Sequence, residues 1–308
     1  MLLKNKIPLT YALGKIRKEI ILVTAYAILI ALVYDRFHFT RISIPLSVPM
    51  VMVTVLSLLL AFKSNQAYDR WWEARTIWGA IVNDSRTLAR QIATMTFTEY
   101  DSDALDIFRE RFIKRQIAWG YVLGQSLRGA RTFKGLEDVL VESERSYIDR
   151  YDNKPFALLE LHGRDLNFAM RKKWLNKYQQ VEIDNTITRL CNAMGQCERI
   201  KNTVFPSTYS LYIRFAMYFF IILLPFALIE MFGLMEIPMV VAIASSYLLI
   251  EKMAIHLQDP FENRPTDTPV TAIAATIERD LRQALNDLHT DHHKSLATKG
   301  KEHDYYIM

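Results

Sequence analysis

Residues 42–75 read ISIPLSVPMVMVTVLSLLLAFKSNQAYDRWWEAR, and this stretch decides the fold. Its first part, residues 42–62, carries no charge and is long enough to cross a bilayer as a helix. Pro45 and Pro49 fall in its first turns, where a missing backbone N–H costs least. No glycine or proline follows as far as Arg75, so we expect one helix that leaves the membrane and continues into the cytosol. The paired tryptophans near its exit suit a membrane interface.

The rest of the chain repeats this division between apolar and charged stretches. Hydrophobic residues make up 51% of the 308 residues and charged residues 23%, and the two kinds segregate along the chain. We expect four transmembrane helices, at about residues 20–34, 42–62, 211–230 and 235–255. The shorter segments reach spanning length if flanking charges such as Arg214 face water or protein. The basic N-terminus resembles a signal peptide, but no small-residue cleavage site follows, so we expect a retained anchor.

Basic residues beside the spans predict the orientation of the chain. Five of them precede the first span, and Lys63, Arg70 and Arg75 follow the second, whereas the hairpin at residues 230–236 has none. Arg36 and Arg41 in the first connecting loop disagree mildly. The pattern favours a multi-pass protein of the cell membrane, the inner membrane in bacteria, with both termini in the cytoplasm.

The remaining sequence has a helical pattern and no strand pattern. Apolar residues recur at spacings of three and four, as along residues 181–194, and glycine and proline are sparse. We therefore expect an all-α chain with a large cytosolic helical region over residues 63–210 and 256–290 and a polar tail at 291–308. A further helix is predicted after Asp267 or Thr268 as its cap, with Pro269 at its first position.

Four short blocks in this sequence resemble the bestrophin family, most closely its bacterial branch. They are Ile44-Pro45, Arg70-Trp71-Trp72, the run from Gly195 to Pro206, and Asp259-Pro260-Phe261. The blocks occur in the family's order and spacing, and the resemblance extends to about Leu288. It implies a single bestrophin-like domain over residues 1–308 that assembles as a homopentameric channel. In that family the second span lines a narrow apolar neck, and a cytosolic vestibule below it ends in a second constriction.

Thr54, Leu58 and Phe62 are the residues that fit such a neck. They are four residues apart, so they share one face of a helix, and an apolar ring can gate by dewetting. Without the resemblance, contact with lipid or a neighbouring helix is the simpler interpretation of Leu58 and Phe62. For the second constriction the sequence leaves Val181 and Ile183 as alternatives, and a core position remains open for either.

The sequence predicts no metal site and no cofactor. Calcium-gated animal members carry a dense acidic run after the Asp-Pro-Phe block, whereas here Arg264 separates Glu262 from Asp267. Calcium requires several carboxylate ligands, so we expect calcium-independent activity. His289, His292 and His293 lie in the polar tail, where solvation is the simpler interpretation, and His162 lacks further ligands nearby.

The function predicted from these features is passage of ions down their gradient rather than catalysis. Enzyme signatures such as paired Glu-x-x-His motifs, a phosphate loop or a nucleophile beside a base are missing from the sequence. The family implies a chloride-type anion channel for monovalent ions, although mixed charges near both mouths leave a sodium or potassium channel as an alternative. A transporter or a scaffold is less favoured. The expected partners are monovalent ions, the lipid bilayer and further copies of the chain, but not nucleic acid.

Overall fold

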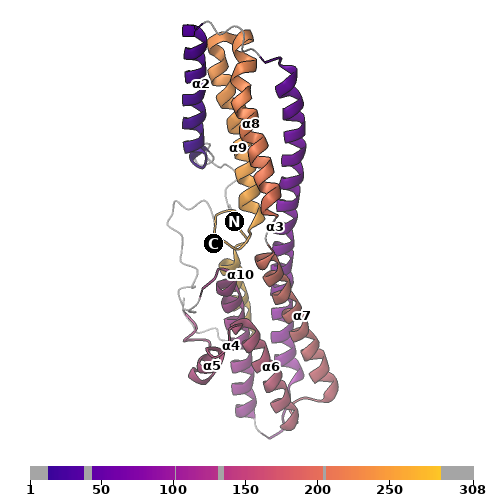
Figure 1. Cartoon of the computed structure of the whole chain (residues 1–308). Helices are drawn as coiled ribbons and strands as arrows, with labels where there is room; N and C mark the ends of the chain where they lie inside the picture. The colour runs from indigo at the N-terminus through magenta and orange to yellow at the C-terminus, as the bar shows by residue number, and fades with distance from the viewer. Residues whose placement is uncertain (1–12, 38–43, 101, 131–134, 204–205, 286–308) are drawn as a thin grey trace. The chain divides into compact units, whose positions relative to one another are not determined.

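The computed structural model describes residues 13–37, 44–100, 102–130, 135–203 and 206–285, and these contain helices and connections but no strand. The prediction of an all-α chain is thereby confirmed. Figure 1 shows the helices in chain order. They are α2 (Arg17–Phe37), α3 (Ser47–Met95), α4 (Ser102–Leu127), α5 (Glu142–Ile148), α6 (Lys154–Arg171), α7 (Lys177–Asn202), α8 (Ser207–Phe232), the short 3-10 turn η1 (Gly233–Met235), α9 (Glu236–Gln258) and α10 (Val270–Ala284).

The chain divides into two compact units. Among the described residues, unit 1 comprises those within 72–203 and 260–285, and unit 2 comprises those within 13–71 and 206–259. Helix α3 contributes residues to both, because its 49 residues run without interruption from Ser47 to Met95. The expectation of one helix that continues past residue 62 is therefore confirmed.

Unit 2 contains the four apolar segments. Helices α8 and α9 form a hairpin through η1, where Gly233 adopts a positive φ of 53°, and α2 packs against both helices. Two helical segments, Ser47–Met95 and Ser207–Gln258, are long and apolar enough to cross a membrane. The second of these contains both α8 and α9. Helix α2 is longer than the predicted apolar segment by a few residues at each end.

Unit 1 is built from the later part of α3 together with α4, α5, α6, α7 and α10. Its core includes Trp78, Phe112 and Trp119, each fully enclosed. Side chains fix the helix starts: Asn176 and Gln179 form a reciprocal capping box on α7, and Asn153 caps α6. These caps satisfy backbone N–H groups that have no partner within the helix.

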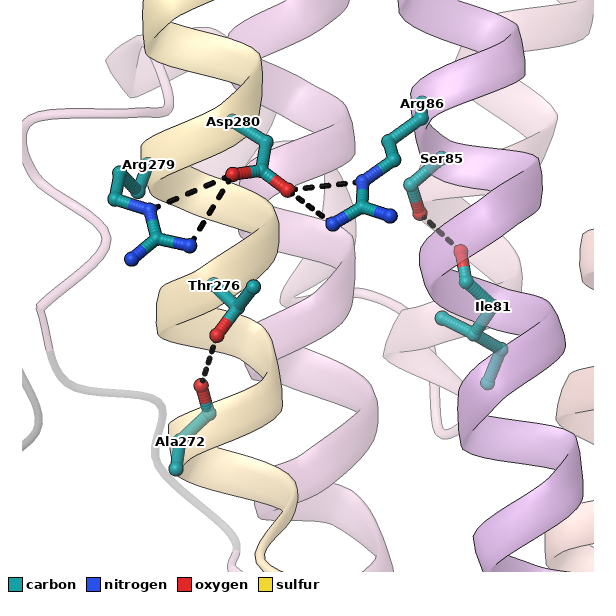
Figure 2. Close-up of polar contacts among 7 residues, drawn as sticks. All are labelled: Ile81, Ser85, Arg86, Ala272, Thr276, Arg279 and Asp280. Atoms are coloured by element: carbon teal, nitrogen blue, oxygen red, sulfur yellow. Dashed lines mark hydrogen bonds and ion pairs between the residues drawn. The ribbon is translucent and has the colours of Figure 1, made fainter.

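Helix α10 is held in unit 1 by an apolar face and by polar contacts. The predicted face of Ile273, Ile277 and Leu281 is buried. Asp280 accepts two hydrogen bonds from Arg86 of α3, at 2.9 and 2.5 Å. Figure 2 shows these contacts, with Arg279 on the other side of the Asp280 carboxylate. The same figure shows Ser85 and Thr276, whose hydroxyls donate to the carbonyls of Ile81 and Ala272 one turn earlier.

The predicted cap of α10 was wrong. The helix begins at Val270, directly after Pro269, without a side-chain cap. The Oδ2 atom of Asp267 instead accepts from the backbone N–H of Arg264 at 2.9 Å, closing the turn that precedes the helix. An aspartate can bond either forward into a helix or back into a turn, and the pattern of residue types does not distinguish the two.

Gly124 of α4 lets α10 approach closely. A Cβ at Gly124 would lie 3.3 Å from Cγ2 of the buried Val270, whereas a Cβ at Gly163 of α6 would meet nothing within 4 Å. We therefore predict that Gly124→Val lowers the free energy of unfolding by about 1–3 kcal/mol, because the added methyl groups overpack the α4–α10 contact. Gly163→Val is the matched control and should be neutral or slightly stabilising, since valine favours a helix more than glycine does. Thermal unfolding of the purified protein in detergent measures both, and equal melting temperatures for the two variants would contradict the prediction.

Candidate functional site

Helix α3 has two unlike faces within unit 2. Leu56 and Leu60 are buried, each 2% exposed, among residues of α8 and α9. On the opposite face Leu58 is 57% exposed and Phe62 54% exposed, and Thr54 is also exposed. The three residues predicted for a neck therefore share a face that a single copy of the chain leaves uncovered.

This open face is broader than the sequence prediction. Val51 and Val55 lie on it as well and are 65% and 54% exposed. The hydroxyl of Thr54 donates to the carbonyl of Met50 at 2.9 Å, so it needs no partner outside its own helix. The face is thus apolar and uncharged, and lipid, another copy of the chain or a pore lumen must lie against it.

A charge cluster lies on the inward side of α3, one residue past Phe62, and the sequence analysis missed it. Lys63, next to Phe62, is 0% exposed, and its Nζ lies 3.9 Å from Oε1 of Glu251 on α9. Arg214 of α8 donates from Nε to the same carboxylate oxygen at 3.2 Å, while half of its side chain stays exposed. One carboxylate therefore faces two cations. The burial of Lys63 had a signal in the sequence, because it is three residues after Leu60 on the inward face.

The family blocks around Arg70 and Asp259 meet in the structure. Nε of Arg70 donates to the carbonyl of Gln258, the last residue of α9, at 2.9 Å. Beside Arg70, the rings of Tyr68 and Trp71 are 6.0 Å apart, and Trp72 is 55% exposed. The hydrogen bond links α3 to the end of α9 across 188 positions of sequence.

The other two residues of the Asp-Pro-Phe block, Pro260 and Phe261, belong to unit 1 and stabilise its fold. Phe261 is 1% exposed and belongs to the hydrophobic core. The carbonyl of Pro260 accepts from the backbone N–H of Thr268 at 3.1 Å. These two residues therefore anchor the turn that leads into α10.

The two residues considered for a second constriction have different environments. Ile183 is 0% exposed and packs in the core of unit 1, so the core position left open for it applies. Val181 is 60% exposed near the start of the same helix, α7. Residues that are two positions apart on a helix are separated by about 200° of rotation, so Val181 and Ile183 face opposite ways.

The carboxylates after the Asp-Pro-Phe block do not converge on one point. Glu262 accepts from Lys201 at 2.5 Å, and this contact lowers the pKa of its carboxyl. Asp267 is 2% exposed, and burial raises its pKa despite the bond from the Arg264 backbone. In the part of the chain that the structure describes, no three His, Cys, Asp or Glu residues are grouped as metal ligands. His289, His292 and His293 lie outside the described residues.

His162 is a buried titratable group that the sequence analysis set aside. Its ring is fully enclosed and packs against Phe112, with centroids 4.1 Å apart and the ring planes tilted by 37°. Burial, and then the charge of Arg115, hold its pKa well below the ordinary value. Arg115 itself bonds to Glu144 of α5 and, at 2.7 Å, to Asp165 of α6. The cluster belongs to the core of unit 1 and to no open site.

Comparison with known sequences gives one consistent result. Residues 10–283 match the family model described as bacterial/fungal bestrophin protein. A voltage-dependent anion channel-forming protein of Nostoc is 30% identical over 298 residues, which cover 95% of this chain and 91% of the relative. A protein of the same description in Escherichia coli K12 is 27% identical over 275 residues, which cover 89% of this chain and 88% of that relative.

Solved structures agree with the sequence matches. The crystal structure of a bacterial bestrophin homolog from Klebsiella pneumoniae is similar with a TM-score of 0.81 and 25% identity. The match covers 88% of this chain and 98% of that one. The resemblance predicted from the four sequence blocks is therefore confirmed.

The buried cluster of Lys63, Arg214 and Glu251 generates a stability prediction. Glu251→Gln leaves both cations without a carboxylate and should cost about 3–5 kcal/mol in unfolding free energy. Lys63→Met should cost less, since Arg214 still pairs with Glu251, and the double variant should be more stable than Glu251→Gln alone. Thermal unfolding in detergent measures all three.

The matched control for this series is an exposed ion pair between α3 and α7. Glu73 pairs with Arg199, and the two side chains are 45% and 63% exposed. Glu73→Gln should change stability by less than about 1 kcal/mol, because water screens the pair. A Glu251→Gln variant as stable as Glu73→Gln would show that the buried cluster carries no net charge interaction.

Proposed function

We propose that this chain, which belongs to the bestrophin family of bacteria and fungi, forms an anion channel in a membrane. The observation that carries the proposal is the uncharged outer face of α3 with Thr54, Leu58 and Phe62 exposed along it. The relatives described as anion channel-forming proteins support the choice of ion. The same description supports a channel over an enzyme.

In the proposed channel, Thr54, Leu58 and Phe62 line a narrow neck. A single α3 cannot enclose a pore, so several copies must place this face around a common axis. Five copies follow from family membership. The apolar side chains of Val51 and Val55 then lie against the lumen or the adjacent copy, which covers surface that one copy leaves exposed.

Val181 is our candidate for the cytosolic constriction. It is an exposed apolar residue close to the start of α7, followed by Glu182. Ile183 is not proposed again for this role, since its side chain is enclosed within unit 1.

The charge next to the neck supports anions. The neck residues are neutral, so a fixed side-chain charge within it cannot select ions. Just beyond the neck, the inward-facing Lys63 and the half-exposed Arg214 outnumber Glu251 by one positive charge. A local positive potential raises the concentration of anions at that mouth. We extend this to monovalent anions of the chloride type.

The proposal includes the setting of the channel. Helices α2, α8, α9 and the first part of α3 are the four spans, both termini lie in the cytoplasm, and the membrane is the cell membrane. The basic residues after the second span support this orientation. Activity is proposed to be independent of calcium, because Glu262 and Asp267 have other partners.

Widening the neck should increase ion flux. We predict that Leu58→Ala and Phe62→Ala raise single-channel conductance, because removing a large side chain from every copy eases wetting of an apolar constriction. Leu211→Ala and Phe215→Ala are matched controls: both side chains are exposed, at 62% and 71%, but lie on α8. Recordings from protein in planar bilayers test the four variants. Equal conductance for Phe62→Ala and Phe215→Ala would show that this face of α3 does not line the pore.

The reversal potential in a salt gradient tests the function itself. With potassium chloride at different concentrations on the two sides, we expect a reversal potential near the chloride equilibrium value, unchanged by a calcium chelator. A value near the potassium equilibrium potential would identify a cation channel of the same fold. Absence of current from folded protein would contradict channel activity, and loss of current with the chelator would contradict calcium independence.

A further inference from the structure

Unit 2 has an apolar groove between α2 and α8, away from the face of α3 described above. It has a volume of about 230 Å³, and its lining includes Leu22 and Tyr26 of α2 and Tyr218 and Ile222 of α8. Leu22 is 69% exposed and Ile222 49% exposed, so the groove is open along its length. Its size is below that of a typical pocket for a compact ligand, which favours a thin, flexible apolar occupant.

Two polar side chains of the lining, Tyr26 and Glu19, already have partners within the protein. The hydroxyl of Tyr26 donates to the carbonyl of Ile222 at 2.9 Å. Glu19, the charged residue of the lining, pairs with Lys252 of α9 at 3.1 Å. A ligand in the groove therefore meets hydrocarbon and no free hydrogen-bonding group of these two side chains.

One end of the groove is bordered by cations from both helices. Lys18 is one helical turn before Leu22, and Arg214 is one turn before Tyr218, so each lies on the same helix face as a lining residue. The two helix starts lie at the same end of unit 2, because Glu19 and Arg214 both pair with residues near the end of α9. Lys18 and Arg214 are exposed.

We propose that this groove binds an anionic phospholipid, with one acyl chain between α2 and α8 and the phosphate between Lys18 and Arg214. The charge pattern decides the occupant. An apolar groove bordered at one end by two exposed cations complements a hydrocarbon chain that ends in a negative headgroup. The inference rests on the membrane setting of the proposed function but not on passage of ions. It therefore stands or falls separately from channel activity.

Native mass spectrometry of the purified complex tests the proposal, with phosphatidylglycerol and phosphatidylcholine added in turn. We expect the parent protein to retain phosphatidylglycerol more strongly. Lys18→Gln should weaken its binding roughly fivefold and leave phosphatidylcholine unchanged, since one charge near the headgroup is lost. Arg17→Gln is the matched control, because Arg17 is an exposed neighbour one turn before Ile21, which does not line the groove.

A second pair of variants tests the groove rather than the charge. Ile222→Trp fills it and should reduce retention of both lipids, whereas Leu211→Trp, at an exposed position of α8 outside the lining, should not. Equal retention of the two lipids by the parent protein, or unchanged binding in Ile222→Trp, would overturn the proposal. A change in the number of copies per complex caused by Ile222→Trp would also overturn it, because a second copy would then occupy the groove.

Discussion

The uninterrupted α3 helix is the constraint on which the structure depends. Residues of α3 enter both hydrophobic cores: Leu56 and Leu60 belong to that of unit 2, and Trp78 and Ile92 to that of unit 1. Within a bilayer a chain must satisfy its backbone hydrogen bonds internally, which a continuous helix does. Since the inner face within unit 2 is committed to its core, the outer face with Leu58 and Phe62 is left for contacts beyond a single copy.

Buried ion pairs fix how the other helices meet. Lys63, Arg214 and Glu251 join α3, α8 and α9, while Arg115 joins Glu144 and Asp165 across α4, α5 and α6. Such pairs add little net stability, because desolvation of the charges offsets their attraction. Apolar side chains accept many packing arrangements, whereas a buried charge accepts only those that supply its partner. We infer that these clusters specify the arrangement of the helices rather than strengthen it.

The proposed function follows from how this charge is distributed. The outer face of α3 has no charge, so in the proposed channel it offers a dewetted passage rather than a binding site. Beyond it, Lys63 on the inward face and Arg214 of α8 give a positive excess. In that proposal, the barrier to flux and the preference for one ion come from different residues. The groove between α2 and α8 lies on different helices and is proposed to bind lipid, so the two proposals give the same unit two kinds of surface with separate roles.

The sequence by itself determined the helical class, the apolar segments, the long α3 helix and the family, because each depends on local pattern. It also placed Thr54, Leu58 and Phe62 on one face, since helical rotation per residue is constant.

Periodicity does not say which face is turned inward. Val181 and Ile183 belong to one apolar stretch of sequence, yet packing against neighbouring helices buries only Ile183. For the same reason the sequence did not reveal that Lys63 is buried, because its partner Glu251 lies 188 residues later in the chain (251 − 63). The same limit also explains Asp267, which closes a turn instead of capping α10. Tertiary structure decided these positions because burial and charge pairing are properties of two surfaces in contact, and a sequence pattern describes only one of them.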